Sequence, residues 1–236
     1  MSQKSEYIAT RQLSTQSLEQ IQAAGLRLRT VPLIDSRQVR LGRPLDGLAE
    51  RWIFTSAKAV KSLLAQDRQA FLAAAAARTL AVVGEKSTRL LKEQGLTVAV
   101  TAPQAEALTE LLIAAYEPGG ATYFCGNRSM ETLPNLLQFA GFKLETYPVY
   151  ETLLMPQEVS WKTAKGALFF SPSAVDSYFQ ENSWPVEKTA FAIGTTTAKA
   201  LATAGVKQIE TAGYPSEAAL IQKLLTWENA HVPATD

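Results

Sequence analysis

The chain has 236 residues, of which 47% are hydrophobic and 19% charged, with 23 Lys and Arg against 22 Asp and Glu. This length lies between one large domain and two small ones, and the composition excludes a disordered chain. A formal charge of +1 argues against a generally basic nucleic-acid binder, and no apolar run approaches the roughly 20 residues that span a bilayer. We therefore expect a soluble globular protein that binds neither nucleic acid nor membrane.

The chain has one cysteine, Cys125, and one histidine, His231. A single cysteine cannot close an intramolecular disulfide or fill a multi-cysteine metal site, so we expect a buried core thiol, no bound metal and a cytoplasmic location. His231 lies in the polar tail 229–236, which we expect to lack regular structure, so imidazole acid–base chemistry is not expected. The polar opening 1–6 also lacks the apolar core of a secretory signal peptide.

Short apolar runs recur along the chain, and each is followed by a segment with helical spacing. This pattern is typical of the βα units of a parallel sheet. The runs begin near residues 7, 52, 80, 97, 122, 167, 190 and 207. Helix starts are expected at Ser14 or Thr15, Ser56, Ser87, Pro103, Ser129, Pro172 or Ser173, Thr196 and Pro215, and helix ends at Gly25, Gly95, Gly141 and Gly205.

The units resemble one another in pairs, which indicates an internal repeat. Residues 54–60 (FTSAKAV) match 170–175 (FSPSAV), 83–91 (VGEKSTRLL) match 193–201 (IGTTTAKAL), and 101–108 match 211–220. The fourth pair joins the first and fifth units, where 24–32 (AGLRLRTVP) match 140–148 (AGFKLETYP). With the unit types lettered, the chain order is D, A, B, C, D, A, B, C, which is two copies of a four-unit domain with one copy split.

This order predicts a discontinuous α/β domain from 1–30 and 158–236 and a continuous one from 45–146. The segments 31–44 and 147–157 would then cross between them as linker strands, because both have β-like character and contain proline. The alternative is one large continuous sheet, since shared turn chemistry alone can make βα units look alike.

The predicted strand-to-helix turns are rich in Gly, Ser and Thr and poor in carboxylates. They lie at 55–56, 84–87, 126–129, 171–173 and 194–197. Helix N-termini at the carboxyl edge of a parallel sheet favour anions, so two such domains facing one another would line a cleft suited to an anionic ligand. Neither a P-loop nor a dinucleotide fingerprint occurs, and no carboxylate pair suits general acid–base catalysis. Arginines cluster between 27 and 51, either as a solvated surface or as a basic rim of the cleft.

The chain resembles the uroporphyrinogen-III synthase family over essentially its whole length. The resemblance rests on the segments 54–60, 83–87, 125–128 (CGNR), 147–152 (YPVYET), 169–175 and 192–201. The resemblance implies two flavodoxin-like parallel-sheet domains, the first discontinuous, joined by a two-stranded linker. It also implies a cofactor-free cyclising lyase of haem biosynthesis. Its substrate would be hydroxymethylbilane, a linear tetrapyrrole with eight carboxylates, which is closed to uroporphyrinogen III with loss of water and inversion of ring D. A transient contact with the preceding enzyme of the pathway belongs to the same expectation.

The resemblance also implies roles for particular residues. Tyr150 matches the tyrosine that assists loss of the hydroxyl group. The substrate-binding positions expected are Arg11, Ser56, Ser87, Ser171, Ser173, Thr196 and Thr197. Two other readings stay open on the same scaffold: a non-catalytic two-domain binder of an anionic small molecule, and a flavodoxin-like redox or signalling module.

Overall fold

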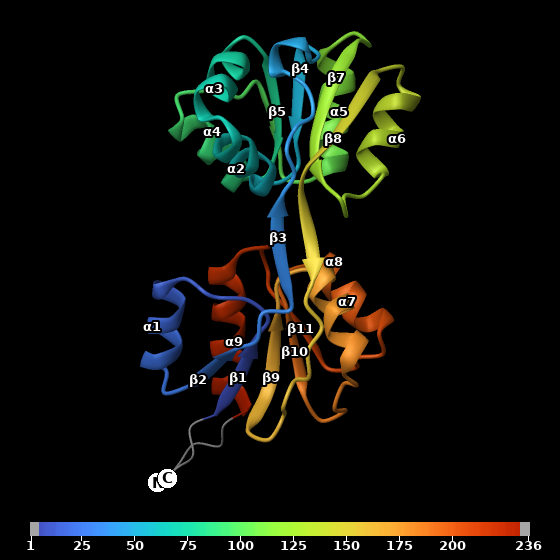
Figure 1. The fold of residues 1–236 in the computed structure, drawn as a ribbon. Coiled ribbons are helices and arrows are strands. Elements are labelled where there is room, and N and C mark those ends of the chain that lie inside the picture. Colours follow the sequence, from blue (N-terminus) through green and yellow to red (C-terminus); the bar gives the residue numbers. More distant parts are fainter. Residues whose placement is uncertain (1–4, 232–236) are drawn as a thin grey trace. The chain divides into compact units, whose positions relative to one another are not determined.

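The computed structural model describes residues 5–231 and divides the chain into two compact units. Unit 1 combines the two ends of the chain, Met1–Asp35 and Leu153–Asp236, and unit 2 is the continuous segment Ser36–Thr152. Each unit is built on its own predominantly parallel sheet (Figure 1). The predicted fold class, two parallel-sheet α/β domains of which the first is discontinuous, is therefore confirmed.

In its described residues, unit 1 has five strands in the order β2-β1-β9-β10-β11, and every neighbouring pair is parallel. The strands are β1 (Glu6–Ala9), β2 (Arg27–Thr30), β9 (Ala164–Phe169), β10 (Thr189–Ala192) and β11 (Ile209–Thr211). Helices α1 (Thr15–Ala23) and α9 (Glu217–His231) cover one face, and α7 (Pro172–Glu181) and α8 (Thr195–Thr203) cover the other (Figure 1). Both faces of this sheet are apolar, because helices cover the strands on both sides.

The described sheet of unit 2 has the order β3-β8-β7-β4-β5-β6, parallel from β8 to β6. Its strands are β3 (Ile34–Gln38), β4 (Arg51–Phe54), β5 (Thr79–Val83), β6 (Val100–Ala102), β7 (Gly120–Gly126) and β8 (Lys143–Leu154), with a 3-10 turn at Leu45–Gly47. Helices α2 (Ala57–Gln66), α3 (Arg68–Ala76) and α4 (Glu85–Glu93) cover one face. Helices α5 (Ala105–Ala115) and α6 (Thr132–Phe139) cover the other.

The two sheets repeat one strand order. The order in unit 1 is β2-β1-β9-β10-β11, and the corresponding order in unit 2 is β8-β7-β4-β5-β6. Strands at the same place in the two orders are the ones that the internal repeat makes equivalent. In such a doubly wound sheet, the strand order reverses at one point, and ligands bind outside the carboxyl ends of the strands there. That point lies between β1 and β9 in unit 1 and between β4 and β7 in unit 2.

The linker consists of β3 and the far end of β8, which are neighbours in the sheet. Val39 N donates to Val149 O at 2.9 Å, Arg37 pairs with Glu151 at 2.5 Å, and Met155 N donates to Leu33 O at 2.9 Å. The partners run in opposite directions along the chain, so this pairing is antiparallel. The expected two-stranded linker is present.

Several predicted helix boundaries hold at the level of single hydrogen bonds. The hydroxyls of Ser14, Ser56 and Ser171 cap α1, α2 and α7 by accepting a backbone N–H two or three residues further along the chain. Gly25, Gly95, Gly141 and Gly205 have φ between 74° and 89°, the left-handed conformation that ends a helix. Cys125 is buried at the end of β7, as expected.

Other predicted boundaries are wrong. Helix α4 begins directly after Gly84, so Ser87 lies inside its first turn. Helix α6 begins at Thr132 rather than Ser129, because Pro134 has no N–H and fits only the first turn. The strand expected from residue 97 begins at Val100.

The expectation of an irregular tail is wrong as far as residue 231. Helix α9 extends to His231, whose ring stacks on Trp227 with 4.2 Å between ring centroids. Residues 232–236 lie outside the described part.

Candidate active site

The switch point of unit 2 brings together the ends of β4 and β7. Thr55 and Ser56 follow β4, and Asn127 follows β7, while Tyr150 reaches the same edge from the neighbouring β8. The sequence predicted Ser56 and Tyr150 separately, and the folded sheet brings their side chains together across the end of β7.

A bulge in β8 aims Tyr150. Cys125 of β7 pairs with Pro148, but the next residue, Gly126, pairs with Tyr150, so Val149 is the extra residue in β8. Because side chains alternate along a strand, one extra residue changes the face on which Tyr150 lies. The carbonyl of Val149 accepts hydrogen bonds from Val39 N and from the buried Ser62 hydroxyl, which hold the bulge in place.

Gly126 makes room for the Tyr150 ring. A Cβ atom at Gly126 would lie 2.5 Å from Cζ and 2.9 Å from the phenolic oxygen of Tyr150. Real Cβ atoms do not approach other atoms so closely, so only glycine allows the ring to lie across the end of β7. Sequence reasoning treated Gly126 as a turn residue and missed this role, because the contact depends on the register between β7 and β8.

The Tyr150 phenol is half-buried and hydrogen-bonded to Ser56. Burial raises its pKa above the ordinary value, and the hydrogen bond with Ser56 only partly opposes this. Lys58 Nζ lies 5.7 Å from the centre of the Tyr150 ring. At neutral pH the phenol therefore keeps its proton and is available as a hydrogen-bond donor.

Tyr150 lines a hollow of about 220 Å³ between α2 and the linker strand β3. Basic side chains from both elements, Arg37, Lys58 and Lys61, line the same hollow. Lys61 was not predicted as a site residue, and Arg37 was expected only as one arginine of a possible basic rim, because only the folded sheet brings residue 37 beside residues 58 to 61.

The switch point of unit 1 holds Arg11 after β1 and Ser171 after β9. The Arg11 guanidinium lies 4.2 Å from the centre of the Phe170 ring and pairs with Glu217 at 2.8 Å. Glu217 Oε1 also accepts hydrogen bonds from Ser14 N, Ser14 Oγ and Ser17 Oγ at 2.6 to 2.8 Å. Burial disfavours the Glu217 carboxylate, but these hydrogen bonds and the Arg11 charge outweigh it and lower the pKa. Arg11 is thus held at the switch point by an acidic partner that the sequence did not reveal.

The remaining predicted residues occupy equivalent helix starts. Ser87 is the third residue of α4 and Thr197 the third of α8, and their side chains are buried, with 3% and 2% exposed. Thr196 is exposed in the first turn of α8, and Ser173 is half-buried in that of α7. All four lie at helix N-termini, where backbone N–H groups lack intrahelical partners.

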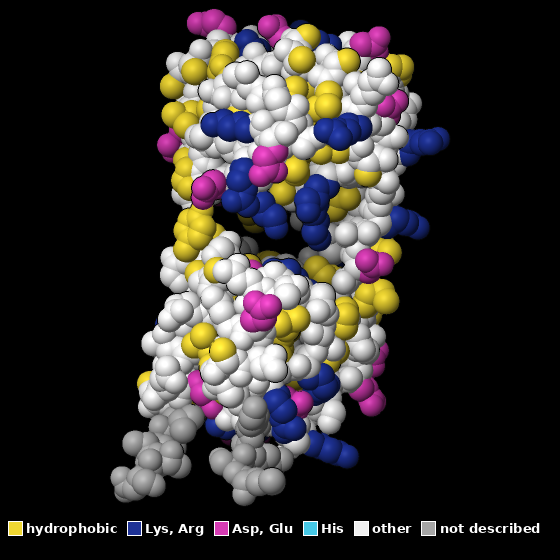
Figure 2. All heavy atoms as spheres, turned by 90° about the vertical axis from the view of Figure 1, so that its left-hand side faces the viewer, with side chains coloured by type: hydrophobic (Ala, Val, Ile, Leu, Met, Phe, Trp, Pro, Cys, Tyr) yellow, Lys and Arg dark blue, Asp and Glu magenta, His cyan; other side chains and the backbone are white. Residues whose placement is uncertain are grey.

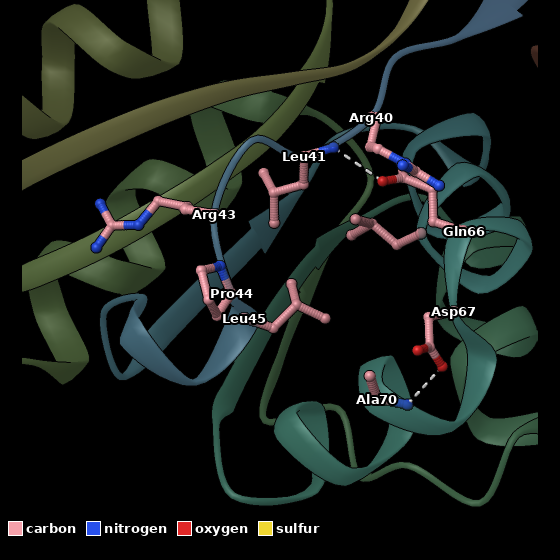
Figure 3. A pocket seen from close by; sticks show the side chains of 9 residues that line it. Arg40, Leu41, Arg43, Pro44, Leu45, Gln66, Asp67 and Ala70 are labelled. Atoms are coloured by element: carbon pink, nitrogen blue, oxygen red, sulfur yellow. Dashed lines mark hydrogen bonds between the residues drawn. The ribbon is translucent and has the colours of Figure 1, made fainter.

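A second hollow, of about 340 Å³, lies away from this edge, beside the carboxyl end of α2 (Figure 3). Several of its polar groups are used internally, since Gln66 Oε1 accepts from Leu41 N at 2.8 Å and Asp67 caps α3 through Ala70 N. The Arg43 guanidinium donates to the Tyr147 hydroxyl at 2.8 Å. These groups hold the fold together, so the hollow is a weaker candidate for an active site than the Tyr150 hollow.

Within residues 5–231, no cluster of His, Cys, Asp or Glu is placed to hold a metal ion. Among the same residues, none of the helices combines the length and the apolar composition that crossing a membrane requires.

Each unit has a parallel sheet with hydroxyl-rich helix starts at its switch point. This arrangement is typical of α/β proteins that bind anionic small molecules. A family model described as uroporphyrinogen-III synthase HemD matches residues 16–222. The chain therefore belongs to the uroporphyrinogen-III synthase family, whose reaction cyclises hydroxymethylbilane with loss of water in haem biosynthesis. No curated protein sequence matches it significantly.

Solved structures of the family share the fold. The uroporphyrinogen-III synthetase of Helicobacter pylori is 20% identical, with a TM-score of 0.69, covering 94% of this chain and 99% of its own. A mutant uroporphyrinogen III synthase of Thermus thermophilus is 18% identical, with a TM-score of 0.71, covering 96% of this chain and 98% of its own.

Proposed function

We propose that Tyr150 is the proton donor of the cyclisation. The reaction begins when the hydroxymethyl carbon of hydroxymethylbilane loses its hydroxyl group, leaving an azafulvene. Hydroxide is a poor leaving group, so a donor at its oxygen lowers the barrier. The observation that carries the proposal is the phenol of Tyr150, which keeps its proton at neutral pH and is positioned by Ser56 and Gly126.

The later steps depend more on the conformation in which the substrate is held than on an acid or a base. Ring closure through a spiro intermediate inverts the last pyrrole, and it requires that the flexible chain be folded and shielded from water. We propose that backbone N–H groups at the starts of α2 and α4 in unit 2 and of α7 and α8 in unit 1 bind carboxylates of the substrate. Ser56, Ser87, Ser171, Ser173, Thr196 and Thr197 mark these turns, and Arg11 adds a positive charge beside Ser171. At Ser87 and Thr197 the buried hydroxyl leaves the backbone N–H as the binding group.

The test is to supply enzymatically generated hydroxymethylbilane and to resolve the product isomers, because spontaneous closure gives isomer I. We expect isomer III from the native chain. Tyr150→Phe should lower turnover by about 10- to 10⁴-fold, the usual range for loss of a general acid, with an unchanged melting temperature.

Isomer III formed at the native rate by Tyr150→Phe would remove the tyrosine from the mechanism. Tight binding of the tetrapyrrole with isomer I as the only product would instead favour the non-catalytic binder.

We further propose that the enzyme works in the cytoplasm and receives its unstable substrate through a transient contact with the enzyme that releases it. Rapid spontaneous closure of free hydroxymethylbilane makes such a transfer useful. Co-sedimentation of the two enzymes during turnover, absent without substrate, would support the contact.

A further inference from the structure

Lys61 of α2 lines two hollows at once. One is the hollow of about 220 Å³ that also contains Tyr150, Lys58 and Arg37. The other, of about 300 Å³, lies between α2 and α4 and is lined by Lys86, Arg89 and Glu93 among others. Both hollows belong to unit 2, and Lys61 is part of the wall of each.

The charges along these hollows are mostly positive. Arg37 is paired with Glu151 at 2.5 Å, and Arg89 is near Glu93 at 3.8 Å. Among the described residues, neither Lys61 nor Lys86 forms an ion pair, so both ammonium groups are available to a ligand. Figure 2 shows Lys and Arg side chains gathered on the face of unit 2 that carries α2 and α4.

We propose that Lys61 and Lys86 form a carboxylate-binding track that continues from the Tyr150 hollow to the groove between α2 and α4. This inference rests on the proposed function and names side chains that hold the substrate beyond the helix N-termini. A substrate with eight carboxylates has more charges than the backbone N–H groups of one turn can bind. A flexible lysine suits this task, because its ammonium group reaches a carboxylate without fixing one geometry.

The position of the track favours the substrate over a macromolecular partner. Lys61 lies in the wall of the hollow that holds the proposed acid, and Lys86 lies in the first turn of α4, where the helix dipole also favours an anion. A carboxylate held by Lys61 would therefore belong to the molecule on which Tyr150 acts.

The experiment titrates five variants with the octacarboxylate porphyrin obtained by oxidising the product, following the fluorescence of the porphyrin at several salt concentrations. The variants are Lys61→Gln, Lys86→Gln, the double variant, Lys61→Arg, and Lys143→Gln as a matched control. Lys143 is an exposed lysine of the same unit at the opposite end of β8 and lines neither hollow. Melting temperatures check that each variant is folded, and Lys61→Arg tests whether the positive charge alone restores binding.

We expect each single variant to weaken binding about 2- to 5-fold and the double variant by about the product of these factors, the range for exposed ion pairs. The salt dependence of the affinity should decrease in the same order. In turnover, KM should rise by similar factors while kcat changes less. Lys143→Gln should bind like the native chain, and Lys61→Arg should recover most of the lost affinity.

Native affinity and native salt dependence in the double variant would contradict the proposed carboxylate-binding track. So would an equal loss in Lys143→Gln, because the effect would then reflect only net charge. The titration needs no turnover, so it tests whether Lys61 and Lys86 bind carboxylates even if the chain makes no isomer III. Conversely, a chain that makes isomer III with unaffected lysine variants keeps the proposed function and loses only this inference.

Discussion

The absence of a Cβ atom at Gly126 leaves the space that the Tyr150 ring occupies in the candidate site. The ring of Tyr150 lies where a Cβ of residue 126 would be, and the bulge at Val149 turns it to that face. The hydroxyl of Ser56, already the cap of α2, then meets the phenol. Three local features of different elements thus position the phenol that we propose as the proton donor.

The first prediction concerns Gly126→Ala. The added methyl group should displace the Tyr150 ring, since the nearest ring atom lies 2.5 Å from the position of the new Cβ. We expect turnover to fall at least about 10-fold, toward that of Tyr150→Phe, with a loss of stability of about 1 to 3 kcal/mol from overpacking. Gly42→Ala is the control, because a Cβ there meets nothing within 4 Å. Steady-state kinetics and thermal unfolding measure both effects, and native turnover in Gly126→Ala would contradict the positioning role.

At the scale of elements, Glu217 joins the starts of two helices. It begins α9 and accepts three hydrogen bonds from Ser14 and Ser17 at the start of α1, while it pairs with Arg11 after β1. A carboxylate near a helix N-terminus also interacts favourably with the helix dipole.

The second prediction is that Glu217→Gln destabilises the protein by about 1 to 3 kcal/mol at pH 7, the value of hydrogen bonds to a charged group. The folded-state pKa of Glu217 is lowered from 4.5, so its contribution is fully present above pH 4.5 and is lost as pH falls through the lower folded value. Denaturant unfolding at pH 7 and at about pH 3 to 4 should therefore show the difference from the native chain shrinking on acidification. A difference independent of pH would contradict the assignment.

The third prediction concerns the contact of β9 with β10. A Cβ at Gly166 would collide with the backbone oxygen of Thr189, its partner in the register of the two strands. A backbone atom cannot move aside as a side chain does, so Gly166→Ala should cost about 3 kcal/mol or more. Gly213→Ala, in the same unit with open space around its Cβ, should be within about 0.5 kcal/mol of the native chain. Similar melting temperatures for the two variants would contradict this reading of β9.

At the scale of the whole molecule, the chain crosses between its units twice, so the two units differ in what they need to fold. Unit 2 is continuous, and nearly all of its described sheet and both helical layers lie within Ser36–Thr152. Unit 1 takes β1 from one end of the chain and β9 from the other, and these two strands are neighbours in its sheet.

The fourth prediction follows for fragments. Residues 36–152 expressed alone should unfold cooperatively, because they keep a complete core. Residues 153–236 alone should not, because the loss of β1, β2 and α1 leaves one edge of β9 unpaired and removes part of the cover of the face that α1 shares with α9. Circular dichroism with thermal unfolding measures both. A cooperative transition in 153–236, or its absence in 36–152, would contradict the proposed domain plan.

The sequence by itself determined the fold class, the split repeat and most helix ends. These depend on local chemistry: apolar runs define strands, Ser14, Ser56 and Ser171 cap helices through bonds a few residues away, and glycines end helices in the left-handed conformation. The order of the repeats carried long-range information as well, because equivalent units take equivalent places in both sheets. The resemblance of these segments to one family supplied Tyr150 and the hydroxyl positions.

The tertiary structure alone decided which residues meet at the site. The bulge at Val149, the space above Gly126, the partner of Arg11 at Glu217 and the place of Lys61 between two hollows all depend on register or on contacts between segments far apart in the chain. A shift of one residue in a strand moves a side chain to the opposite face, and no local pattern encodes that shift. The sequence could therefore predict the edge of the sheet at which the candidate site is proposed, but the packed sheets were needed to place each group.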